Sequence, residues 1–201
     1  LYVEELNRVP EETVNLLITV MSEGELHLPR VGRVEAAEGF RLVAAMNPFD
    51  NVGTARVSGA VYDRICRIAM GYQDSTDEDG IVAARAGDDH DRLRTRAVAV
   101  TRATRNHSDV RVGSSVRGAI DLVEVDRRLA RIRGLDIDDP SVGLDAALVA
   151  LSGRIRLHEG GDRTAEEVVR ELWEAVLAAE AASDGADPKA TAPSGATPAV
   201  D

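Results

Sequence analysis

The sequence predicts an α/β segment, then an all-helical segment and a disordered tail. Two apolar runs, residues 1–3 and 40–46, have the composition of buried strands. Strand patterns largely vanish after Asp74, where helical periodicity takes over. From Ser183 the chain is mostly Ala, Pro, Ser, Thr, Gly and Asp, a composition that buries too little apolar surface to fold. The expected parts are residues 1–74, 75–182 and 183–201.

The composition limits the classes of protein to which this chain can belong. The 201 residues suffice for one domain or two small ones, and with 3% aromatic residues the core must consist of Leu, Val, Ile and Ala. A net charge of −11 argues against a broad nucleic-acid surface. The single cysteine, Cys66, excludes an internal disulfide and fits a reducing cytoplasm. The absence of a long apolar run predicts no membrane span and a cytoplasmic location.

The first part is predicted to alternate between strands and helices. A helix follows Pro10, because proline suits a first helical position and apolar residues recur at helical spacing up to Met21. A hairpin, a strand ended by Asn47-Pro48, one helical turn and a further strand come next. The hairpin is expected at residues 25–28 and 33–36, and the strand before Asn47 at residues 40–46. The helical turn is expected at residues 58–62 and the further strand at residues 65–70.

The second part is predicted to contain helices alone after an acidic linker over residues 74–79. Ser114 or Ser115 is the expected N-cap of one helix, Asp139-Pro140 opens another, and Thr164 to Glu167 form a capping box for the last. The expected helical ranges are 81–86, 93–106, 116–132, 140–153 and 165–182.

Two adjacent carboxylates, Glu4 and Glu5, follow the first predicted strand. Ligands of open α/β sheets bind at the carboxyl ends of strands. Neighbouring side chains on a strand point to opposite faces, so we expect the two carboxylates to act differently. One would hold a metal ion, directly or through water, and the other would polarise a water molecule. The alternative is an ordinary acidic helix start.

Three further polar positions stand at predicted strand ends or loops. Asn47 follows a strand, although it also suits a turn before proline. Asp63-Arg64 is a charged pair that could equally be solvated. Arg117 lies at a helix start, where the helix dipole disfavours a cation unless an anion is bound there.

These motifs, in order and spacing, resemble the AAA+ ATPases of the MoxR branch and their dynein-related relatives. Residues 1–10 look like a Walker B strand, and residues 40–48 are similar to a sensor-1 strand. Arg64 matches the position of the arginine finger, and residues 113–119 look like the start of a sensor-2 helix. The resemblance covers about residues 1–180 and implies the carboxyl-side part of a P-loop AAA+ parallel-sheet core followed by a helical lid.

The resemblance also implies roles for individual residues. Glu5 would activate the attacking water, Glu4 would hold Mg²⁺ in place of the usual aspartate, and Asn47 would position the water near the γ-phosphate of ATP. Arg117 would contact that phosphate from the lid. Arg64 would complete the site of a neighbouring subunit in a homo-oligomeric ring, most simply a hexamer. The implied output is chaperone-like remodelling or maturation of a client, in some relatives a von Willebrand factor A-domain protein.

Departures from the family pattern leave alternatives open. Ile65 replaces the usual phenylalanine, and the sequence contains no Gly-x-x-x-x-Gly-Lys-Ser/Thr loop. Because the chain opens inside a strand pattern, we expect a fragment whose phosphate loop lies upstream of Leu1 and which is inactive alone. The first alternative is a non-catalytic interaction or regulatory module. The second, a nucleic-acid-binding helical domain, would use arginines that we instead expect on a solvated face or at a subunit contact: Arg92, Arg94, Arg96, Arg102 and Arg105.

Overall fold

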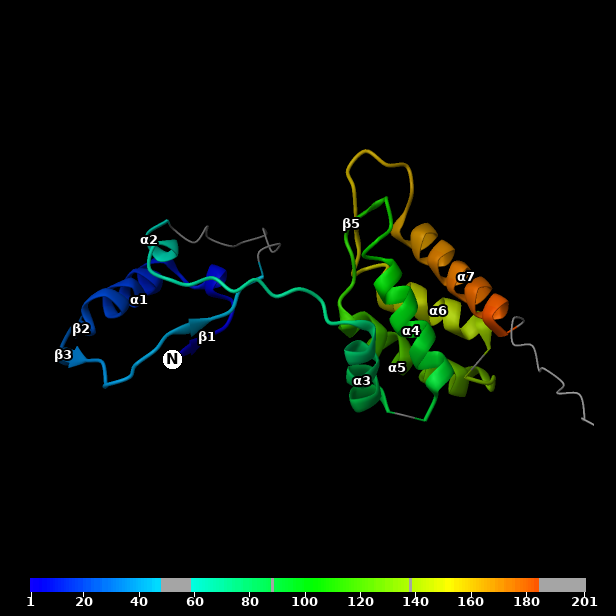
Figure 1. The fold of residues 1–201 in the computed structure, drawn as a ribbon, viewed down its shortest axis with the longest axis horizontal. Coiled ribbons are helices and arrows are strands. Elements are labelled where there is room, and N and C mark those ends of the chain that lie inside the picture. Colours follow the sequence, from blue (N-terminus) through cyan, green and yellow to red (C-terminus); the bar gives the residue numbers. More distant parts are fainter. Residues whose placement is uncertain (48–58, 88, 138, 185–201) are drawn as a thin grey trace, which may run out of the picture. The chain divides into compact units, whose positions relative to one another are not determined.

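The computed structural model describes residues 1–47, 59–87, 89–137 and 139–184, and it divides the chain into two compact units, Leu1–Met70 and Gly71–Asp201. Figure 1 shows the helices and strands of both units. The first unit contains β1 (Tyr2–Val3), a 3₁₀ turn (Leu6–Arg8), α1 (Glu11–Glu23), β2 (Glu25–Leu28), β3 (Gly32–Glu35), β4 (Val43–Ala44) and α2 (Gly59–Tyr62). The second contains α3 (Ser75–Ala86), α4 (Asp91–Ala103), β5 (Val110–Val112), α5 (Val116–Arg133), α6 (Pro140–Leu151), β6 (Arg156–Leu157) and α7 (Ala165–Asp184).

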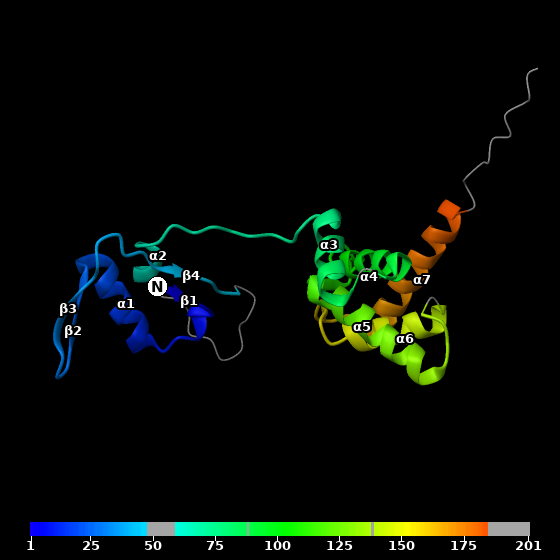
Figure 2. The ribbon, with the colours of Figure 1, turned by 90° about the horizontal axis from the view of Figure 1, so that it is seen from below.

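Strands β1 and β4 form a parallel pair in the first unit (Figure 2). Tyr2 is opposite Val43, and Val3 is opposite Ala44. Parallel neighbours need a long crossover, which α1 and the β2–β3 hairpin supply. The strand predicted over residues 40–46 therefore exists, but it is two residues long. The expectation that it is buried is wrong, because Val43 and Ala44 are both exposed.

Other predictions for the first unit have mixed outcomes. Helix α1, the hairpin and the turn α2 are confirmed. The strand predicted over residues 65–70 is wrong: this segment has no regular structure, and the side chains of Ile68 and Met70 are 85% and 91% exposed. An apolar run becomes a strand only where a neighbouring backbone supplies its hydrogen bonds. Residues 48–58, between β4 and α2, lie outside the described residues.

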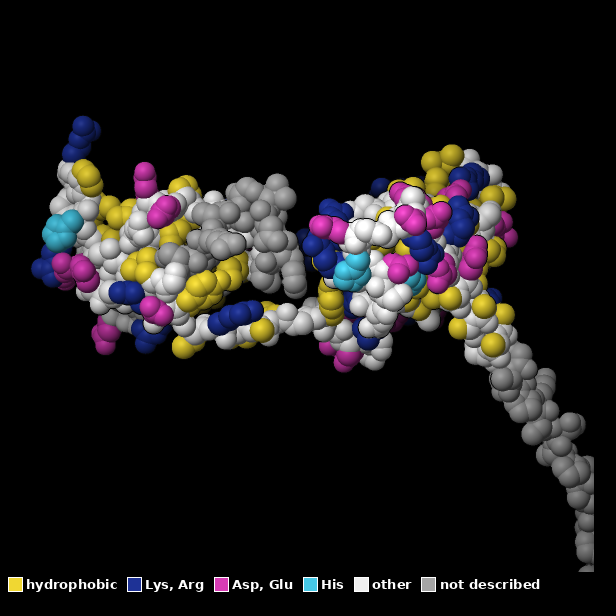
Figure 3. Space-filling view, turned by 90° about the horizontal axis from the view of Figure 1, so that it is seen from above, with side chains coloured by type: hydrophobic (Ala, Val, Ile, Leu, Met, Phe, Trp, Pro, Cys, Tyr) yellow, Lys and Arg dark blue, Asp and Glu magenta, His cyan; other side chains and the backbone are white. Residues whose placement is uncertain are grey.

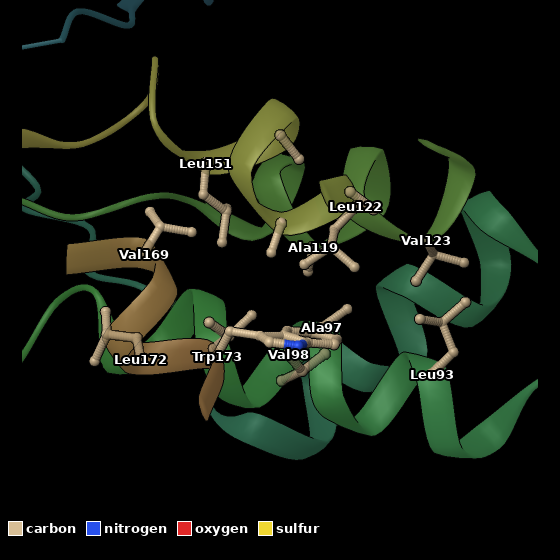
Figure 4. Close-up of a cluster of buried hydrophobic side chains, with 14 of the residues drawn as sticks. Leu93, Ala97, Val98, Ala119, Leu122, Val123, Leu151, Val169, Leu172 and Trp173 are labelled. Atoms are coloured by element: carbon tan, nitrogen blue, oxygen red, sulfur yellow. The ribbon is translucent and has the colours of Figure 1, made fainter. Parts of the chain in front are cut away.

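The helices of the second unit enclose one apolar core. Figure 4 shows Trp173 of α7 lying against Ala97 and Val98 of α4, with Leu122 of α5 and Leu151 of α6 in the same cluster. Trp173 is 1% exposed, and its ring packs so closely on α6 that a Cβ on Gly143 would lie 2.3 Å from a ring carbon. The buried residues of α7 are Val168, Val169, Leu172 and Trp173.

The acidic stretch 74–79 is a helix start, so the prediction of a linker there is wrong. The Asp74 side chain accepts a hydrogen bond of 2.8 Å from the Asp77 backbone N–H, and α3 begins at Ser75. The physical reason is that a side-chain oxygen satisfies a free amide of the first turn, and carboxylates there are favoured by the helix dipole. Acidic and polar residues, which suggest a linker, therefore form the N-terminal end of helix α3.

Helix ends elsewhere in the second unit agree better with the sequence. Thr164 and Glu167 exchange the two hydrogen bonds of the predicted capping box, at 2.8 and 3.2 Å. Ser115 is the N-cap of α5, although its side chain makes no capping hydrogen bond. Helix α7 continues to Asp184, beyond the predicted end at residue 182, and the rest of the predicted tail lies outside the described residues.

Two features complete the second unit. Strands β5 and β6 form a short antiparallel pair that the sequence patterns did not predict. None of the described helices is long and apolar enough to cross a membrane.

Candidate active site

The parallel strand pair brings two predicted site segments to one edge of the first unit. The Leu6 backbone N–H donates to the Ala45 carbonyl at 3.0 Å, and Asn7 Nδ2 donates to the Asn47 carbonyl at 3.3 Å. Glu4 and Glu5 directly precede this junction. The carboxylates and Asn47 therefore follow the carboxyl ends of adjacent parallel strands, which is where open α/β sheets bind ligands.

Glu5 stands in a strained backbone conformation. Its φ and ψ are both 50°, which is the left-handed region, where side chains other than glycine are uncommon. The strand ends at Val3, so the predicted alternation of Glu4 and Glu5 across a strand does not apply. Glu5 is instead the residue immediately before the 3₁₀ helix. Strain of this kind is often retained at functional positions.

The Glu5 carboxylate pairs with Arg8, whose Nε lies 3.1 Å from Oε2. Both side chains are more than half exposed, at 61% and 51%. An exposed ion pair contributes about 0–1 kcal/mol, so the pair holds Glu5 only weakly. Glu5 can consequently exchange Arg8 for another partner at small cost.

Arg64 is exposed and held from two sides. Its Nε donates to Ser22 Oγ at 2.7 Å, and its Nη1 donates to the Ala60 carbonyl at 2.9 Å. Ser22 lies in the last turn of α1 and Ala60 in α2. The guanidinium group is therefore fixed on the surface of the first unit, which is compatible both with a finger and with a structural surface charge.

Arg117 lies in the first turn of α5, in the second unit. The loop before it is tightly packed: a Cβ on Gly113 would lie 2.7 Å from the Cα of Arg105, and one on Gly118 would lie 2.2 Å from Ser114 Oγ. Ser114 is buried, and its N–H donates to Thr104 Oγ1 at 2.9 Å. Arg117 itself is exposed, and among the described residues it forms no ion pair. The small residues of this motif thus build the loop, and Arg117 is left available for a ligand.

The donor set at the strand ends fits a magnesium ion. Within the described part of the chain, no group of three or more His, Cys, Asp or Glu side chains is placed to hold a metal. Mg²⁺ keeps several waters and is commonly held by one or two carboxylates plus substrate phosphates. Glu4 supplies one such carboxylate, which fits Mg²⁺ bound together with a phosphate ligand, and not a metal held by protein alone.

The five arginines near α4 form ion pairs within the second unit. The expectation of a solvated face is wrong for Arg94, Arg96 and Arg105, whose side chains are at most 12% exposed, but the Arg92 side chain is 52% exposed. The expected subunit contact stays a prediction. Arg96 Nε lies 2.6 Å from Glu180 Oε2, and Arg94 Nε lies 2.8 Å from Asp79 Oδ1. Arg92 also pairs with Glu180, while Arg102 and Arg105 pair with Glu78. On the face displayed in Figure 3, acidic and basic side chains are interspersed over this unit. The arginines serve to join α4 to α3 and α7.

Reading the sequence missed one buried polar residue in each unit. Asn7 is buried and joins the two strand ends. The signal that could have identified Asn7 was a polar residue four positions after the predicted strand. Glu78 was missed because it lies in the stretch predicted as a linker. The available signal was Asp74, which is placed to cap a helix through the backbone N–H of Asp77.

Comparison with known proteins bears on the same residues. Residues 1–65 match the family model of the AAA domain (dynein-related subfamily). Over 180 residues the chain is 30% identical to the gas vesicle ATPase GvpN of Ancylobacter aquaticus, a match covering 87% of this chain and 48% of GvpN. The resemblance to MoxR-like AAA+ ATPases is confirmed. The matched AAA segment holds the parallel strand pair, and helices follow it, so the fold class expected from the resemblance is also confirmed.

Two further similarities are weaker. The uncharacterized protein YeaC of Bacillus subtilis (strain 168) is 26% identical over 205 aligned positions, covering 86% of this chain and 63% of YeaC. A crystal structure of a candidate ATPase from Cytophaga hutchinsonii is 20% identical over 86% of this chain and 64% of its own, with a TM-score of 0.37, too low to support an argument. The chain thus spans about half of GvpN and under two thirds of YeaC.

Proposed function

We propose that this chain supplies the later half of an ATP-hydrolysing site, and that the complete protein, the product of the reading frame containing these residues, is a MoxR-like ATPase. The junction at Asn7 and Asn47 carries the proposal, because it joins the segment that follows Glu4 and Glu5 to the backbone of the predicted sensor residue. The AAA match over residues 1–65 and the ATPase name of GvpN support the same activity. AAA+ proteins in general use nucleotide with Mg²⁺, so ATP and Mg²⁺ are the proposed ligands.

The residues divide the work as follows. Bound Mg²⁺–ATP supplies the γ-phosphate and neutralises charge during phosphoryl transfer. Glu4 helps to hold the metal, directly or through its water shell. Glu5, once released from Arg8, orients the attacking water and accepts its proton. Asn47 positions that water, and Arg117 contacts the γ-phosphate.

Arg64 is proposed to act on the site of a neighbouring subunit in a homo-oligomeric ring, most simply a hexamer. Its planar guanidinium presents a fork of donors suited to phosphate oxygens. The proposed output is remodelling or maturation of a client protein, and a von Willebrand factor A-domain protein is the candidate client. The surface position of Arg64, fixed by Ser22 and Ala60, supports a role at a subunit edge.

The test compares three proteins. The 201 residues alone should hydrolyse ATP negligibly, because they contain no loop that cradles the phosphates. The complete protein should turn over ATP with Mg²⁺, and Glu5→Gln should abolish turnover while nucleotide binding remains. Glu12→Gln, an exposed glutamate in the first turn of α1, is the matched control and should be fully active. Unchanged turnover in Glu5→Gln would remove the catalytic assignment, and a complete protein without turnover would favour a non-catalytic interaction module.

A further inference from the structure

Glu78 is an almost fully buried carboxylate between two arginines. Its side chain is 1% exposed, Arg105 Nη2 lies 2.7 Å from Oε1, and Arg102 Nη1 lies 2.9 Å from Oε2. Taking a carboxylate out of water is costly unless its oxygens are paired. The buried Glu78 carboxylate therefore fixes the positions of the Arg102 and Arg105 guanidinium groups.

Arg105 uses one guanidinium group for three contacts. Besides the hydrogen bond to Glu78, its Nε donates to the Ser114 carbonyl at 2.8 Å. Its guanidinium carbon also lies 3.9 Å from the centre of the Tyr72 ring. Only arginine has a planar fork that can meet a carboxylate, meet a carbonyl and stack on a ring together.

The same cluster holds the first residues of the second unit. Arg102 Nη1 donates to the Gln73 carbonyl at 3.1 Å, and Tyr72 Oη donates to the Gly113 carbonyl at 3.3 Å. Tyr72 and Gln73 follow Met70, where the first unit ends. The segment entering the second unit and the loop that begins α5 are thus bound to one set of side chains.

Resting on the proposed function, we propose that Arg105 is a positioning residue for ATP hydrolysis. Together with Glu78 it holds the loop of residues 113–115 so that Arg117, at the start of α5, is presented in one place. The stacked Tyr72 ties that loop to the first residues of the second unit. A shift of about 1 Å in a group that contacts the reacting atoms can cost about 100-fold in rate, so such a clamp has a measurable effect.

The test uses Arg105→Lys in the complete protein, with Arg92→Lys in α4 as the control. Lysine keeps the charge beside Glu78 but cannot meet Glu78, Ser114 and Tyr72 at once. Arg105→Lys should lower kcat/KM for ATP by about 10- to 100-fold. Arg92→Lys should leave it unchanged, because Arg92 pairs with Glu180 and Asp184, away from the loop. Full activity of Arg105→Lys would overturn the proposal.

A double-mutant cycle separates positioning from general support of the fold. If Arg105 acts through Arg117, the loss caused by Arg105→Lys should disappear in an Arg117→Ala background. An equal loss in both backgrounds would show that Arg105 is structural only and would overturn the proposal.

Hydrogen exchange provides a readout independent of catalysis. Backbone amides of residues 114–118 in the 201-residue chain should exchange about tenfold faster in Arg105→Lys than in Arg92→Lys, while the core amides of α7 stay protected. Equal exchange in both variants would refute the clamp even if Arg117→Ala is inactive. If Arg117→Ala turns over ATP normally, the assigned role of Arg117 fails, and with it the positioning of Arg117 by Arg105.

Discussion

Asn7 Nδ2 and the backbone carbonyl of Asn47 meet at 3.3 Å, which joins the carboxyl ends of the two parallel strands. Asn7 is 8% exposed, so its amide is a buried polar group satisfied by this contact. The bond sets the distance between the turn at Glu5 and the predicted sensor residue.

Removing the Asn7 amide should loosen that junction. Asn7→Ala should destabilise the complete protein by about 0.5–1.5 kcal/mol, the usual worth of one hydrogen bond, and should lower ATP turnover more than it lowers nucleotide binding. Asn7→Asp should be at least as damaging, since an ionised carboxylate cannot donate to the Asn47 carbonyl. Asn15→Ala, at an exposed position of α1, is the control. Urea unfolding and steady-state kinetics measure both effects, and normal turnover in Asn7→Asp would contradict the role.

Relieving the strained turn at Glu5 should separate stability from activity. Among the described residues, Glu5 and Arg30 are the non-glycine residues with positive φ, at 50° and 67°. A left-handed conformation costs about 1–2 kcal/mol outside glycine, so Glu5→Gly and Arg30→Gly should each raise the unfolding free energy by about 1 kcal/mol. Glu5→Gly should abolish ATP turnover, whereas Arg30→Gly, in the hairpin turn, should preserve it. Equal activity of the two variants would show that the Glu5 carboxylate is not needed for turnover.

Mixing two inactive variants tests whether Arg64 acts between subunits. Arg64→Ala should leave nucleotide binding nearly intact while removing most turnover, because an arginine finger contributes about 10³–10⁵ in rate. Glu5→Gln subunits have a dead site but keep Arg64, so mixed rings should regain part of the activity. Native mass spectrometry can establish that mixed rings form. If they form and stay inactive, Arg64 is a structural surface charge.

The close approach of α6 to Trp173 should make Gly143 intolerant of a side chain. Gly143→Ala places a Cβ 2.3 Å from the indole, and overpacking of this kind costs about 1–3 kcal/mol. Gly80→Ala, in α3, should have the opposite effect, because a Cβ there has no neighbouring atom within 4 Å. Alanine is also more favourable than glycine in a helix by about 1 kcal/mol. Thermal unfolding of the 201-residue chain should therefore shift downward for Gly143→Ala and upward for Gly80→Ala. A neutral Gly143→Ala would mean that the Trp173 ring can move aside.

The ion pairs of Glu180 predict how the second unit responds to acid. Burial alone raises the pKa of Glu180, but hydrogen bonds from Arg96 and Arg92 outweigh burial and hold the pKa below its ordinary value of 4.5. A lowered folded-state pKa stabilises the fold above pH 4.5, and this contribution is lost as the pH falls through the folded-state value. Glu180→Gln should remove that part of the acid dependence. Glu174→Gln, exposed on the same helix, should keep it, and urea unfolding across this pH range gives the measurement.

Local chemistry made several elements predictable. The capping box at Thr164, the N-cap at Asp139 and the stop at Gly134 each depend on contacts within a few residues, so the sequence specifies them. The residue order also indicated that Glu4-Glu5 and Asn47 follow strands, which is enough to suggest a shared sheet edge.

Tertiary structure decided what depends on distant partners. Residues 65–70 have a strand-like pattern but no neighbouring backbone within the described part, while β5 and β6 pair without any strong pattern. The arginines near α4 look like a charged surface in sequence, but Arg96 and Arg105 become largely buried ion-pair partners because α7 and α3 bring Glu180 and Glu78 to them. The sequence determined helix ends such as those at Asp139 and Thr164, because capping depends on near neighbours. Only the fold decided which charges are satisfied internally and which, like Arg117, stay exposed, because that depends on segments 15 to 88 residues apart meeting in space.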